Sequence, residues 1–302
     1  MRQFLTRVIS CLACTAAAFA QSPVVGVGTF IHVVANLDKT MQFYGDGLGL
    51  ELNGAPGPRT FSANAVVENL YDAKGSQSRV AVFKIPGSPL GAEFAEFKDA
   101  VQKPFRPRIQ DPGASLLTIP VRDVGSVMAK LKEDGAPATK GAVVTDPDGF
   151  FVHLVEGTSG AKLSLTVDST DRTLGLFRDL LGFQIAKGSI QDGRRGAGSR
   201  SSTTKVPGTE FDVEFVEYRS RDRKVVIPGI HDPGAGVLRL IVRSVDSLLP
   251  TLKAAGFPVV SAGGETVSIG ARHVVILRDP DNFFVQIFDQ PNSAPNLTPA
   301  PK

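Results

Sequence analysis

Two carboxylates and one imidazole stand inside otherwise apolar, strand-like segments, and these side chains are the best suited to chemistry. Glu93 and Glu214 occupy matching places in two similar segments that lie 121 positions apart. His153 follows an Asp-Pro-Asp-Gly turn and alternates with Phe151 and Val155. A buried carboxylate needs a partner, and a neutral imidazole can bind a metal ion or act as a general base. We therefore expect Glu93 and His153 to be catalytic or binding residues.

These segments recur because the chain contains an internal duplication. Asp-Pro-Asp-Gly-Phe-Phe-Val begins at Asp146 and returns at Asp279 as Asp-Pro-Asp-Asn-Phe-Phe-Val. A constant register of 121 positions also links Ile109–Ala114 to Ile230–Ala235. A long register of this kind is difficult to obtain by chance, so the sequence predicts a repeated structural unit.

The repeated unit combines strands with a helix. Phe30–Ala35 is an apolar strand pattern followed by helical spacing over Asp38–Leu48, and Lys162–Val167 followed by Asp171–Leu181 repeats this order. Each helix leads to a glycine, the residue favoured in a left-handed C-terminal cap. The second pair of units is Leu116–Val121 with Val124–Gly135, and Val237–Val242 with Val245–Gly256. The pattern predicts four modules, each a strand, a helix and about three more strands.

This arrangement resembles the vicinal oxygen chelate superfamily, which includes glyoxalase I, extradiol dioxygenases, and fosfomycin- and bleomycin-resistance proteins. The resemblance rests on Phe-Tyr-Gly-Asp-Gly-Leu-Gly-Leu at Phe43–Leu50 and on the Asp-Pro-Asp turns, and it covers about Val27 to Asp289. It implies an α+β fold of four βαβββ modules paired into two domains. Each domain would be a half-open, eight-stranded β cup with flanking helices.

The duplication and the resemblance together predict the domain boundaries. Residues 21–157 form the first domain, with modules at about 27–98 and 114–157, and residues 158–290 form the second, with modules at about 161–219 and 235–290. Residues 291–302 contain four prolines and are expected to be a disordered tail.

Metal-dependent members of the superfamily place ligands on the first and last strands of each module. These positions fall on Thr29, Glu93, Leu116 and His153 in the first domain, and on Lys162, Glu214, Val237 and Gln286 in the second. Leucine and valine cannot bind a metal ion, and a cationic lysine would repel one. The resemblance therefore leaves two alternatives: a divalent ion held by Glu93 and His153 and completed by Thr29 or water, or cups without a metal ion or other cofactor.

Four polar residues also have structural interpretations. Alternation along the first strand directs Thr29 into the cup and His32 toward the helices, so we expect His32 to be buried and hydrogen-bonded. We expect Lys162 and Glu214 to form a buried ion pair that replaces a lost metal ion. For His153, a functional residue and a satisfied core histidine are equally favoured.

The resemblance implies a small-molecule ligand in the β cup, contacted by Thr29, Leu116, Lys162, Glu214 or Gln286. One version adds metal-assisted lyase, isomerase or dioxygenase chemistry in the first domain, with His153 handling a proton. The alternative is binding or sequestration without catalysis, and a third version makes the second domain a structural partner. With 33 basic and 30 acidic residues the chain has a net charge of only +3, which argues against a nucleic-acid partner. Substrate identity and oligomeric state stay open.

Residues 1–20 have the pattern of a secretory signal peptide. Arg2 and Arg7 form a positive segment, Val8–Phe19 is an apolar run, and Ala18-Phe19-Ala20 supplies small residues at the cleavage positions. Gln21 is therefore the expected mature N-terminus. The two cysteines of the chain, Cys11 and Cys14, lie inside this run, so the mature protein would have no thiol. We therefore expect a secreted or periplasmic protein with no membrane attachment after cleavage.

Overall fold

The computed structural model describes residues 22–54, 60–135, 141–185, 191–192 and 198–290. The expected signal peptide (1–20) and proline-rich tail (291–302) lie outside these residues. Among the described helices, none has the length and apolar character needed to cross a membrane.

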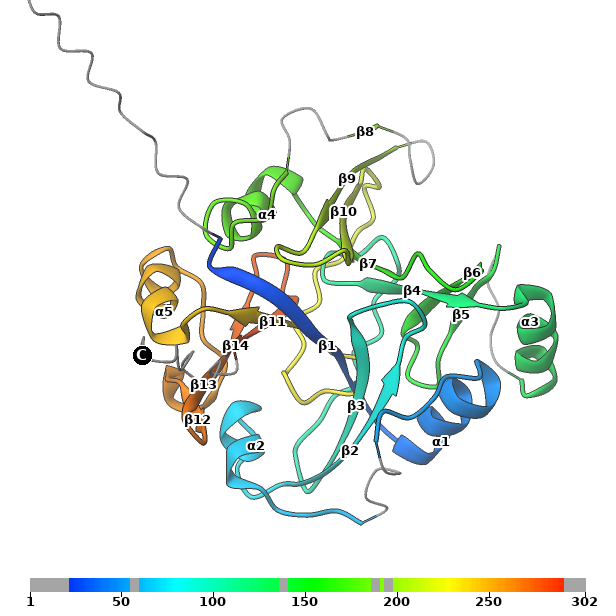
Figure 1. The fold of residues 1–302 in the computed structure, drawn as a ribbon, viewed down its shortest axis with the longest axis horizontal. Helices are drawn as coiled ribbons and strands as arrows, with labels where there is room; N and C mark the ends of the chain where they lie inside the picture. Colours follow the sequence, from blue (N-terminus) through cyan, green and yellow to red (C-terminus); the bar gives the residue numbers. More distant parts are fainter. Residues whose placement is uncertain (1–21, 55–59, 136–140, 186–190, 193–197, 291–302) are drawn as a thin grey trace, which may run out of the picture.

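The chain folds as four consecutive modules, each opening with a strand that leads into a helix (Figure 1). The first contains β1 (Val24–Val34), α1 (Leu37–Met41), the π-helical turn η1 (Gln42–Gly47), α2 (Ala65–Leu70), β2 (Gln77–Lys84) and β3 (Gly91–Lys98). The second contains β4 (Ser115–Val121), α3 (Val124–Glu133), β5 (Val143–Thr145) and β6 (Phe151–Glu156). The third contains β7 (Lys162–Thr166), α4 (Thr170–Phe177), β8 (Gln191–Asp192), β9 (Ser199–Lys205) and β10 (Asp212–Tyr218). The fourth contains β11 (Gly236–Val242), α5 (Val245–Ala254), the 3-10 turn η2 (Ala262–Gly264), β12 (Val267–Ile269), β13 (Arg272–Arg278) and β14 (Phe284–Asp289).

The modules form two seven-stranded sheets, which confirms the predicted α+β class. Sheet A has the order β12-β13-β14-β11-β1-β3-β2, and sheet B has the order β5-β6-β4-β7-β10-β9-β8. Sheet A therefore joins the first module to the fourth, and sheet B joins the second to the third. This pairing differs from the expectation that residues 21–157 and 158–290 each close a cup of their own.

The pairing follows from the strands at the centre of each sheet. β1 runs antiparallel to β11 from Val24–Val242 to His32–Gly236, a longer ladder than the four pairs that join β4 to β7. Module order along a chain is visible in local patterns, but the choice of partner edge depends on contacts between distant residues. Each sheet has seven strands rather than eight within the described residues because Leu52 makes only an isolated bridge and the second module shows two strands after its helix.

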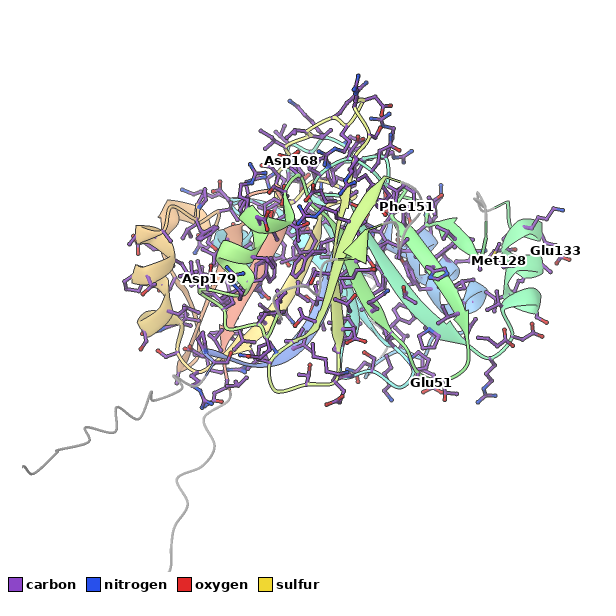
Figure 2. All side chains as sticks on the ribbon, turned by 90° about the horizontal axis from the view of Figure 1, so that it is seen from above. Glu51, Met128, Glu133, Phe151, Asp168 and Asp179 are labelled. Carbon is purple, nitrogen blue, oxygen red and sulfur yellow. The ribbon has the colours of Figure 1, made fainter. Side chains whose placement is uncertain are left out.

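One face of each sheet belongs to a shared hydrophobic core. Phe30 and Leu238 of sheet A join Leu117 and Leu165 of sheet B in one buried cluster, which also includes residues of the helices such as Phe177. The helices lie around this core, and Figure 2 shows α5 and α3 at opposite ends of the molecule, with Met128 and Glu133 on α3. The other face of each sheet is the cup.

The first and third modules repeat the predicted end of their helices. Gly49 has φ 73° and Gly182 has φ 75°, a left-handed conformation that glycine adopts without strain. Since both positions follow the same Leu-Gly signal, the structure confirms the helix ends that the repeat predicts.

Candidate functional site

Cup A is the face of sheet A that carries Thr29, Glu93, Arg239 and Gln286. β1 and β3 pair in an unbroken parallel register from Thr29–Gly91 to Val34–Glu96, so Thr29 and Glu93 point to the same face. On the other side of β1, Arg239 of β11 is the register partner of Gln286 of β14. The sequence predicted three of these residues for ligand or metal binding and missed Arg239.

Arg239 binds the groups that a metal ion would use in this cup. Its Nη1 lies 2.9 Å from Glu93 Oε2 and its Nη2 lies 3.3 Å from Glu93 Oε1. Its Nε donates to Gln286 Oε1, and Thr29 Oγ1 donates to Glu93 Oε2 at 2.9 Å. A fixed cation already neutralises the carboxylate and takes the amide oxygen, so these four residues do not fit a divalent ion.

An apolar cluster closes cup A. Leu70 and Tyr71, at the end of α2, pack with Ile31, Val33 and Val237 of the cup face in a second hydrophobic core. Figure 1 shows α2 on the inner side of the curved sheet A, and α2 contacts β12 and β13. Burial raises the pKa of the Tyr71 hydroxyl, and the nearby Glu93 carboxylate raises it further against the opposing effect of Arg239. Cup A is therefore filled by the protein's own side chains.

Cup B is the equivalent face of sheet B and carries Thr118, His153, Lys162 and Glu214. Thr118 of β4 is the register partner of both His153 on β6 and Lys162 on β7. Lys162 Nζ lies 3.0 Å from Glu214 Oε2, and Ser164 Oγ donates to the same oxygen at 2.7 Å. The Glu214 side chain is 1% exposed and that of Lys162 is 25% exposed, which confirms the predicted buried ion pair.

The two cups use equivalent positions with exchanged residues. The repeat registers of 121 and 133 positions pair Glu93 with Glu214 and Thr29 with Lys162. The same registers pair Arg239 with Thr118, and Gln286 with His153. At these four positions each cup therefore holds one glutamate, one threonine and one cation, but the cation comes from a different position in each.

Cup B differs from cup A in its lining. Ser164, Thr166 and Ser201 are buried on this face, and the Thr118 and Ser201 hydroxyls have no hydrogen-bond partner within the described residues. Buried hydroxyls are usually hydrogen-bonded to protein or to water. In the described part of the chain, neither hydrophobic core includes the face of cup B. Cup A, in contrast, has apolar side chains of the second core packed against its face beside its own polar network.

The structure corrects how the predicted site residues are grouped. Glu93 lies in sheet A and His153 in sheet B, so these two residues cannot hold one ion or one substrate together. Leu116 lies in cup B with His153, Lys162 and Glu214, while Gln286 lies in cup A with Thr29 and Glu93.

A two-residue slip explains the missed residues. The first-strand position was assigned to Leu116 and Val237, but the register partners of His153 and Gln286 are Thr118 and Arg239. Leu116 instead faces Phe151 across the ladder, and Val237 faces Phe284. Thr118 and Arg239 are polar residues in otherwise apolar strands at the 121-position register, and that signal could have identified them.

His32 lies on the opposite face from Thr29, as predicted, and is fully buried. Its Nε2 is 3.0 Å from Asp146 Oδ2, and its Nδ1 is 3.4 Å from the carbonyl oxygen of Ala235. Its ring centroid lies 4.7 Å from that of Phe150, with the two rings tilted at 38°. Burial lowers the pKa of His32, but the Asp146 carboxylate outweighs this effect and the net shift is upward. His32 is thus a structural histidine that joins the first module to the second.

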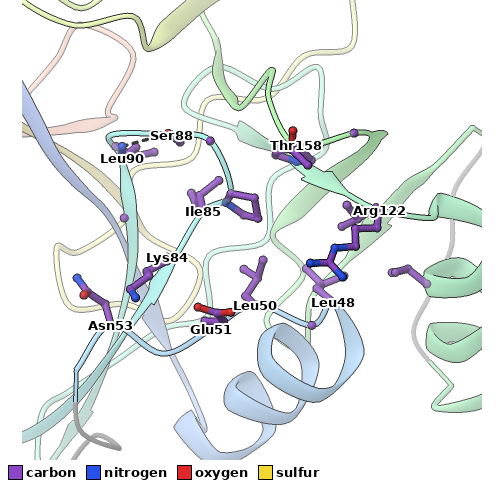
Figure 3. A pocket seen from close by; sticks show the side chains of 18 of the residues that line it. Leu48, Leu50, Glu51, Asn53, Lys84, Ile85, Ser88, Leu90, Arg122 and Thr158 are labelled. Carbon is purple, nitrogen blue, oxygen red and sulfur yellow. Dashed lines mark hydrogen bonds between the residues drawn. The ribbon is translucent and has the colours of Figure 1, made fainter.

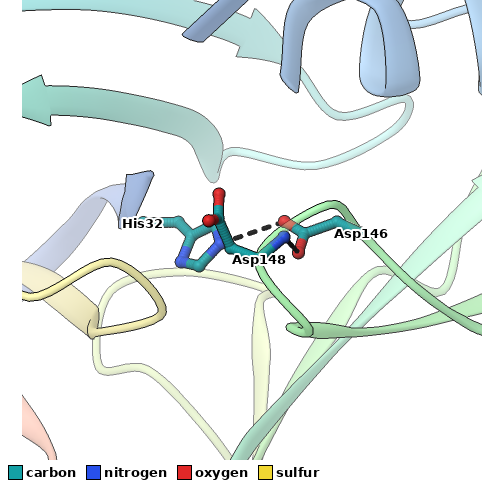
Figure 4. A group of neighbouring side chains, drawn as sticks. All are labelled: His32, Asp146 and Asp148. Atoms are coloured by element: carbon teal, nitrogen blue, oxygen red, sulfur yellow. Dashed lines mark hydrogen bonds and ion pairs between the residues drawn. The ribbon is translucent and has the colours of Figure 1, made fainter. Parts of the chain in front are cut away.

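His32, Asp146 and Asp148 are the one group in the described residues with three metal-ligand side chains in reach of one another (Figure 4). Their ligand atoms lie within 4.8 Å of one another. The carboxylates are already engaged: Asp146 Oδ1 accepts the Asp148 and Phe150 N–H groups, and both Asp148 oxygens accept the Ala35 N–H. Binding a metal ion here would displace hydrogen bonds that shape the turn, so the group fits a structural role better than a metal site.

The second copy of this turn forms without the histidine. Asp281 accepts the Asp168 N–H at 2.8 Å, just as Asp148 accepts the Ala35 N–H. Leu165 stands in the place of His32 in the 133-position register, and Asp281 is instead held by Arg172 Nη2 at 3.0 Å and Thr173 Oγ1 at 2.7 Å, so the turn forms without a histidine. The His32 group therefore needs no ion to explain its geometry.

Comparison with known proteins agrees with this architecture. A model of the Glyoxalase/Bleomycin resistance protein/Dioxygenase superfamily matches residues 26–164. A mutant of glyoxalase I from Zea mays is similar at 14% identity with a TM-score of 0.60, over 89% of this chain and 94% of that chain. A putative dioxygenase from Bacillus subtilis subsp. subtilis str. 168 is similar at 14% identity with a TM-score of 0.54, over 89% of this chain and 86% of that chain. At this identity the two structures show a shared fold alone, and no curated protein sequence matches the chain.

Proposed function

Because the chain belongs to the glyoxalase/bleomycin resistance/dioxygenase superfamily, we propose that it binds a small polar molecule in cup B without a metal ion. Cup A, which contains Glu93, has a structural role in this proposal. The sequence predicts a functional site in the first domain, whereas this proposal places the site in cup B, which the second and third modules form together.

The proposal rests on a difference between the two cups in how they are filled and hydrogen-bonded. In cup A, Tyr71 and Leu70 fill the space over the sheet, and Arg239 takes both oxygens of Glu93. In cup B, the Thr118 and Ser201 hydroxyls are buried and have no described hydrogen-bond partner. Cup A has one buried atom of this kind, Gln286 Nε2, but Leu70 and Tyr71 cover its face. Because a buried polar atom without a partner is costly, a ligand or its bound water at Thr118 and Ser201 would stabilise cup B.

The lining also supports a chemical class for the ligand. The positive charge of Lys162 is offset by Glu214 at 3.0 Å, so the pair adds no net charge to the cup. Hydroxyl groups and the His153 imidazole supply donors and acceptors, while Leu116 and Val216 supply apolar contacts. A neutral molecule with several hydroxyl or carbonyl groups and one apolar side matches this lining.

Catalysis is a second candidate, favoured by the placement of His153. The imidazole is half-buried and lies in the same register row as Thr118 and Lys162. A proton taken from a bound molecule by His153 would give lyase or isomerase chemistry that relies on side chains alone. Metal-assisted lyase, isomerase or dioxygenase chemistry fits the residues less well, because Arg239 and Lys162 already neutralise the two glutamates.

We also propose that the protein is exported. The proposal rests on the basic, apolar and small-residue order of residues 1–20, with Gln21 as the mature N-terminus. N-terminal sequencing of protein secreted by an expression host tests it directly. Sequencing that starts at Met1 would contradict export by cleavage.

A matched pair of isosteric variants tests the binding proposal. A panel of polyols, hydroxy acids and amides is screened by thermal shift against wild type, Thr118→Val in cup B and Thr29→Val in cup A. We expect stabilising compounds for wild type and Thr29→Val, and at least a tenfold loss of affinity for Thr118→Val. Binding lost in Thr29→Val and kept in Thr118→Val would assign the ligand to cup A and overturn the proposal.

Metal analysis separates the metal-free version from the metalloenzyme version. Protein purified without chelator is analysed for bound metal as wild type, Glu93→Ala and His153→Ala. We expect no stoichiometric metal in any of the three. If wild type contains stoichiometric metal and either variant loses it, the metal-free proposal is wrong and the protein is a metalloprotein.

A further inference from the structure

A cavity of about 850 Å³ lies outside both cups, between the first and second modules. Its walls come from the end of η1, the turn between β2 and β3, and the end of β4. Figure 3 shows Arg122 reaching into it near Leu48, with Glu51, Lys84 and Thr158 around the rim. The volume is within the range of ligand-binding pockets, which is about 300–1,000 Å³. Arg122 makes no ion pair with a described residue.

The duplication gives this cavity a counterpart between the third and fourth modules. The 133-position register pairs Leu48 with Leu181 and Gly49 with Gly182, and the 121-position register pairs Arg122 with Arg243. All three pairs are identical in residue type. The two places therefore share these three residues on equivalent elements.

In the counterpart, the space is filled by the chain's own N-terminal segment. Ser22 Oγ donates to the Leu181 carbonyl oxygen at 3.1 Å. Arg243 N donates to the Pro23 carbonyl oxygen at 3.0 Å, and Arg243 Nε donates to the Ser22 carbonyl oxygen at 3.3 Å. The contact is close, since a Cβ on Gly182 would lie 2.6 Å from Ser22 Oγ. These residues bind an extended peptide through backbone and guanidinium donors.

Among the described residues the first half has no such segment, because its strand begins later. β1 pairs with β11 as far as Val24–Val242, whereas β7 pairs with β4 only as far as Lys162–Thr118. Thr158 occupies the place of Val25, and each presents its carbonyl oxygen to an equivalent glycine, Gly87 or Gly208. Before Thr158 the chain leaves along β6, with Gly157 N bonded to Val121 O. Gly157 therefore takes the place of Val24, and in the described part of the chain no residue takes the places of Ser22 and Pro23 in the first half.

The open edge of β4 has one usable donor. Residue 120 is a proline, which has no N–H, so pairing along this edge begins at the N–H of Arg122. Arg243 N is the equivalent donor that binds Pro23 in the other half. The edge is thus protected against general strand pairing but keeps the donor that a short peptide needs.

We propose that the cavity between the first and second modules binds a short extended peptide of a partner protein, in the manner in which Ser22–Val24 binds between the third and fourth modules. Arg122 N and its guanidinium would bind two successive carbonyl groups, and the Leu48 carbonyl would accept from a small hydroxyl side chain. A hydroxyl residue followed by proline and an apolar residue fits this pattern, as in Ser22-Pro23-Val24. Ser22–Val24 of this chain is already bound within its own second half, so we assign the cavity to a peptide of another protein.

A labelled peptide with the sequence of residues 21–26 tests the site by fluorescence anisotropy against the mature chain. Arg122→Ala is the test variant and Arg243→Ala is its matched control in the filled counterpart. Thr158→Trp is a second test variant that fills the cavity from its exposed rim without removing a proposed contact. Thermal unfolding confirms that each variant is folded.

We expect saturable binding to wild type that weakens at least tenfold in Arg122→Ala and in Thr158→Trp and is unchanged in Arg243→Ala. No binding to wild type at millimolar peptide would overturn the proposal. So would binding that only Arg243→Ala weakens, because the peptide would then be exchanging with the N-terminal segment. Concentration-dependent dimerisation of the unlabelled chain that Arg122→Ala abolishes would make the occupant a second copy and would also contradict the proposal.

Discussion

Arg239 holds the Glu93 carboxylate with two guanidinium nitrogens, Nη1 at 2.9 Å from Oε2 and Nη2 at 3.3 Å from Oε1. The fourth module supplies the arginine and the first supplies the glutamate, so the contact also fastens the two ends of the chain together in sheet A. Lys162 and Glu214 make the corresponding contact in cup B at 3.0 Å. In each cup, a basic side chain of the protein thus pairs with the glutamate at the position where metal-dependent members of the superfamily have a metal ligand.

Removing the guanidinium should destabilise the protein. The Glu93 side chain is 13% exposed, so Arg239→Met leaves a nearly buried carboxylate without its partner. Breaking a buried ion pair from one side costs about 3 kcal/mol, and we expect the free energy of unfolding in urea to fall by about that amount.

The double variant Arg239→Met with Glu93→Gln is the control for this prediction. It leaves no unpaired charge, so it should recover more than half of the lost stability. If the single variant is as stable as wild type, the Arg239–Glu93 contact does not hold sheet A together.

The duplicated turn provides a second prediction. Tyr44 Oη donates to Asp146 Oδ2 at 3.2 Å, whereas the equivalent residue Phe177 cannot donate to Asp279, whose Oδ2 has no partner in the described residues. Phe177→Tyr adds a hydroxyl at this place and should raise the free energy of unfolding by about 1 kcal/mol. Tyr44→Phe is the matched control and should lower it by a similar amount. A loss of stability in Phe177→Tyr would show that the two turns are packed differently.

The same aspartate should give stability a dependence on pH. Burial and the neighbouring Asp281 carboxylate raise the pKa of Asp279 to about 8. Between the unfolded value near 4 and this folded value, the native state binds a proton that the unfolded state has lost, so stability falls as pH rises from about 4 to 8. Asp279→Asn keeps an oxygen to accept the Asp281 and Phe283 N–H groups and removes the titration.

Urea unfolding at pH 5 and pH 8 measures this effect. Wild type should lose more stability than Asp279→Asn between the two values. His32 and Asp148 also have raised pKa values and act in the same direction, but both are present in each protein and cancel in the comparison. Equal losses in the two proteins would show that Asp279 does not titrate in this range.

Chelation should leave the protein unchanged. Arg239 and Lys162 neutralise the cup glutamates, and the Asp146 and Asp148 oxygens accept backbone N–H groups, so no described group needs an ion. We expect the same melting temperature with and without EDTA. A decrease on chelation that zinc or manganese reverses, and that His32→Leu abolishes, would place a metal ion in the His32 group.

The elements and their order could be predicted from the sequence because their signals are local. Alternation of strand residues placed Thr29 in the cup and His32 in the core, and the Leu-Gly signals marked helix ends at Gly49 and Gly182. The ion pair of Lys162 and Glu214 followed from two charged residues at matched positions inside apolar strands.

The grouping of the sites could not be predicted in the same way. Whether Glu93 shares a cup with His153 or with Arg239 depends on which strand edges pair, and that choice is made between residues more than a hundred positions apart. Register between distant strands is set by packing and not by either strand alone. The slip from Val237 to Arg239 is different, because a polar residue in an otherwise apolar strand at the 121-position register marks both Arg239 and Thr118 in the sequence.

A methyl NMR titration with the panel of polyols, hydroxy acids and amides tests most directly whether cup B binds the ligand. Thr118, Leu116 and Val216 report on cup B, and Ile31 and Val33 report on cup A. If the ligand binds in cup B, a binding compound shifts the methyl signals of cup B in a saturable way and leaves those of cup A in place. Saturable shifts at Ile31 and Val33 with none at Thr118 would contradict binding in cup B.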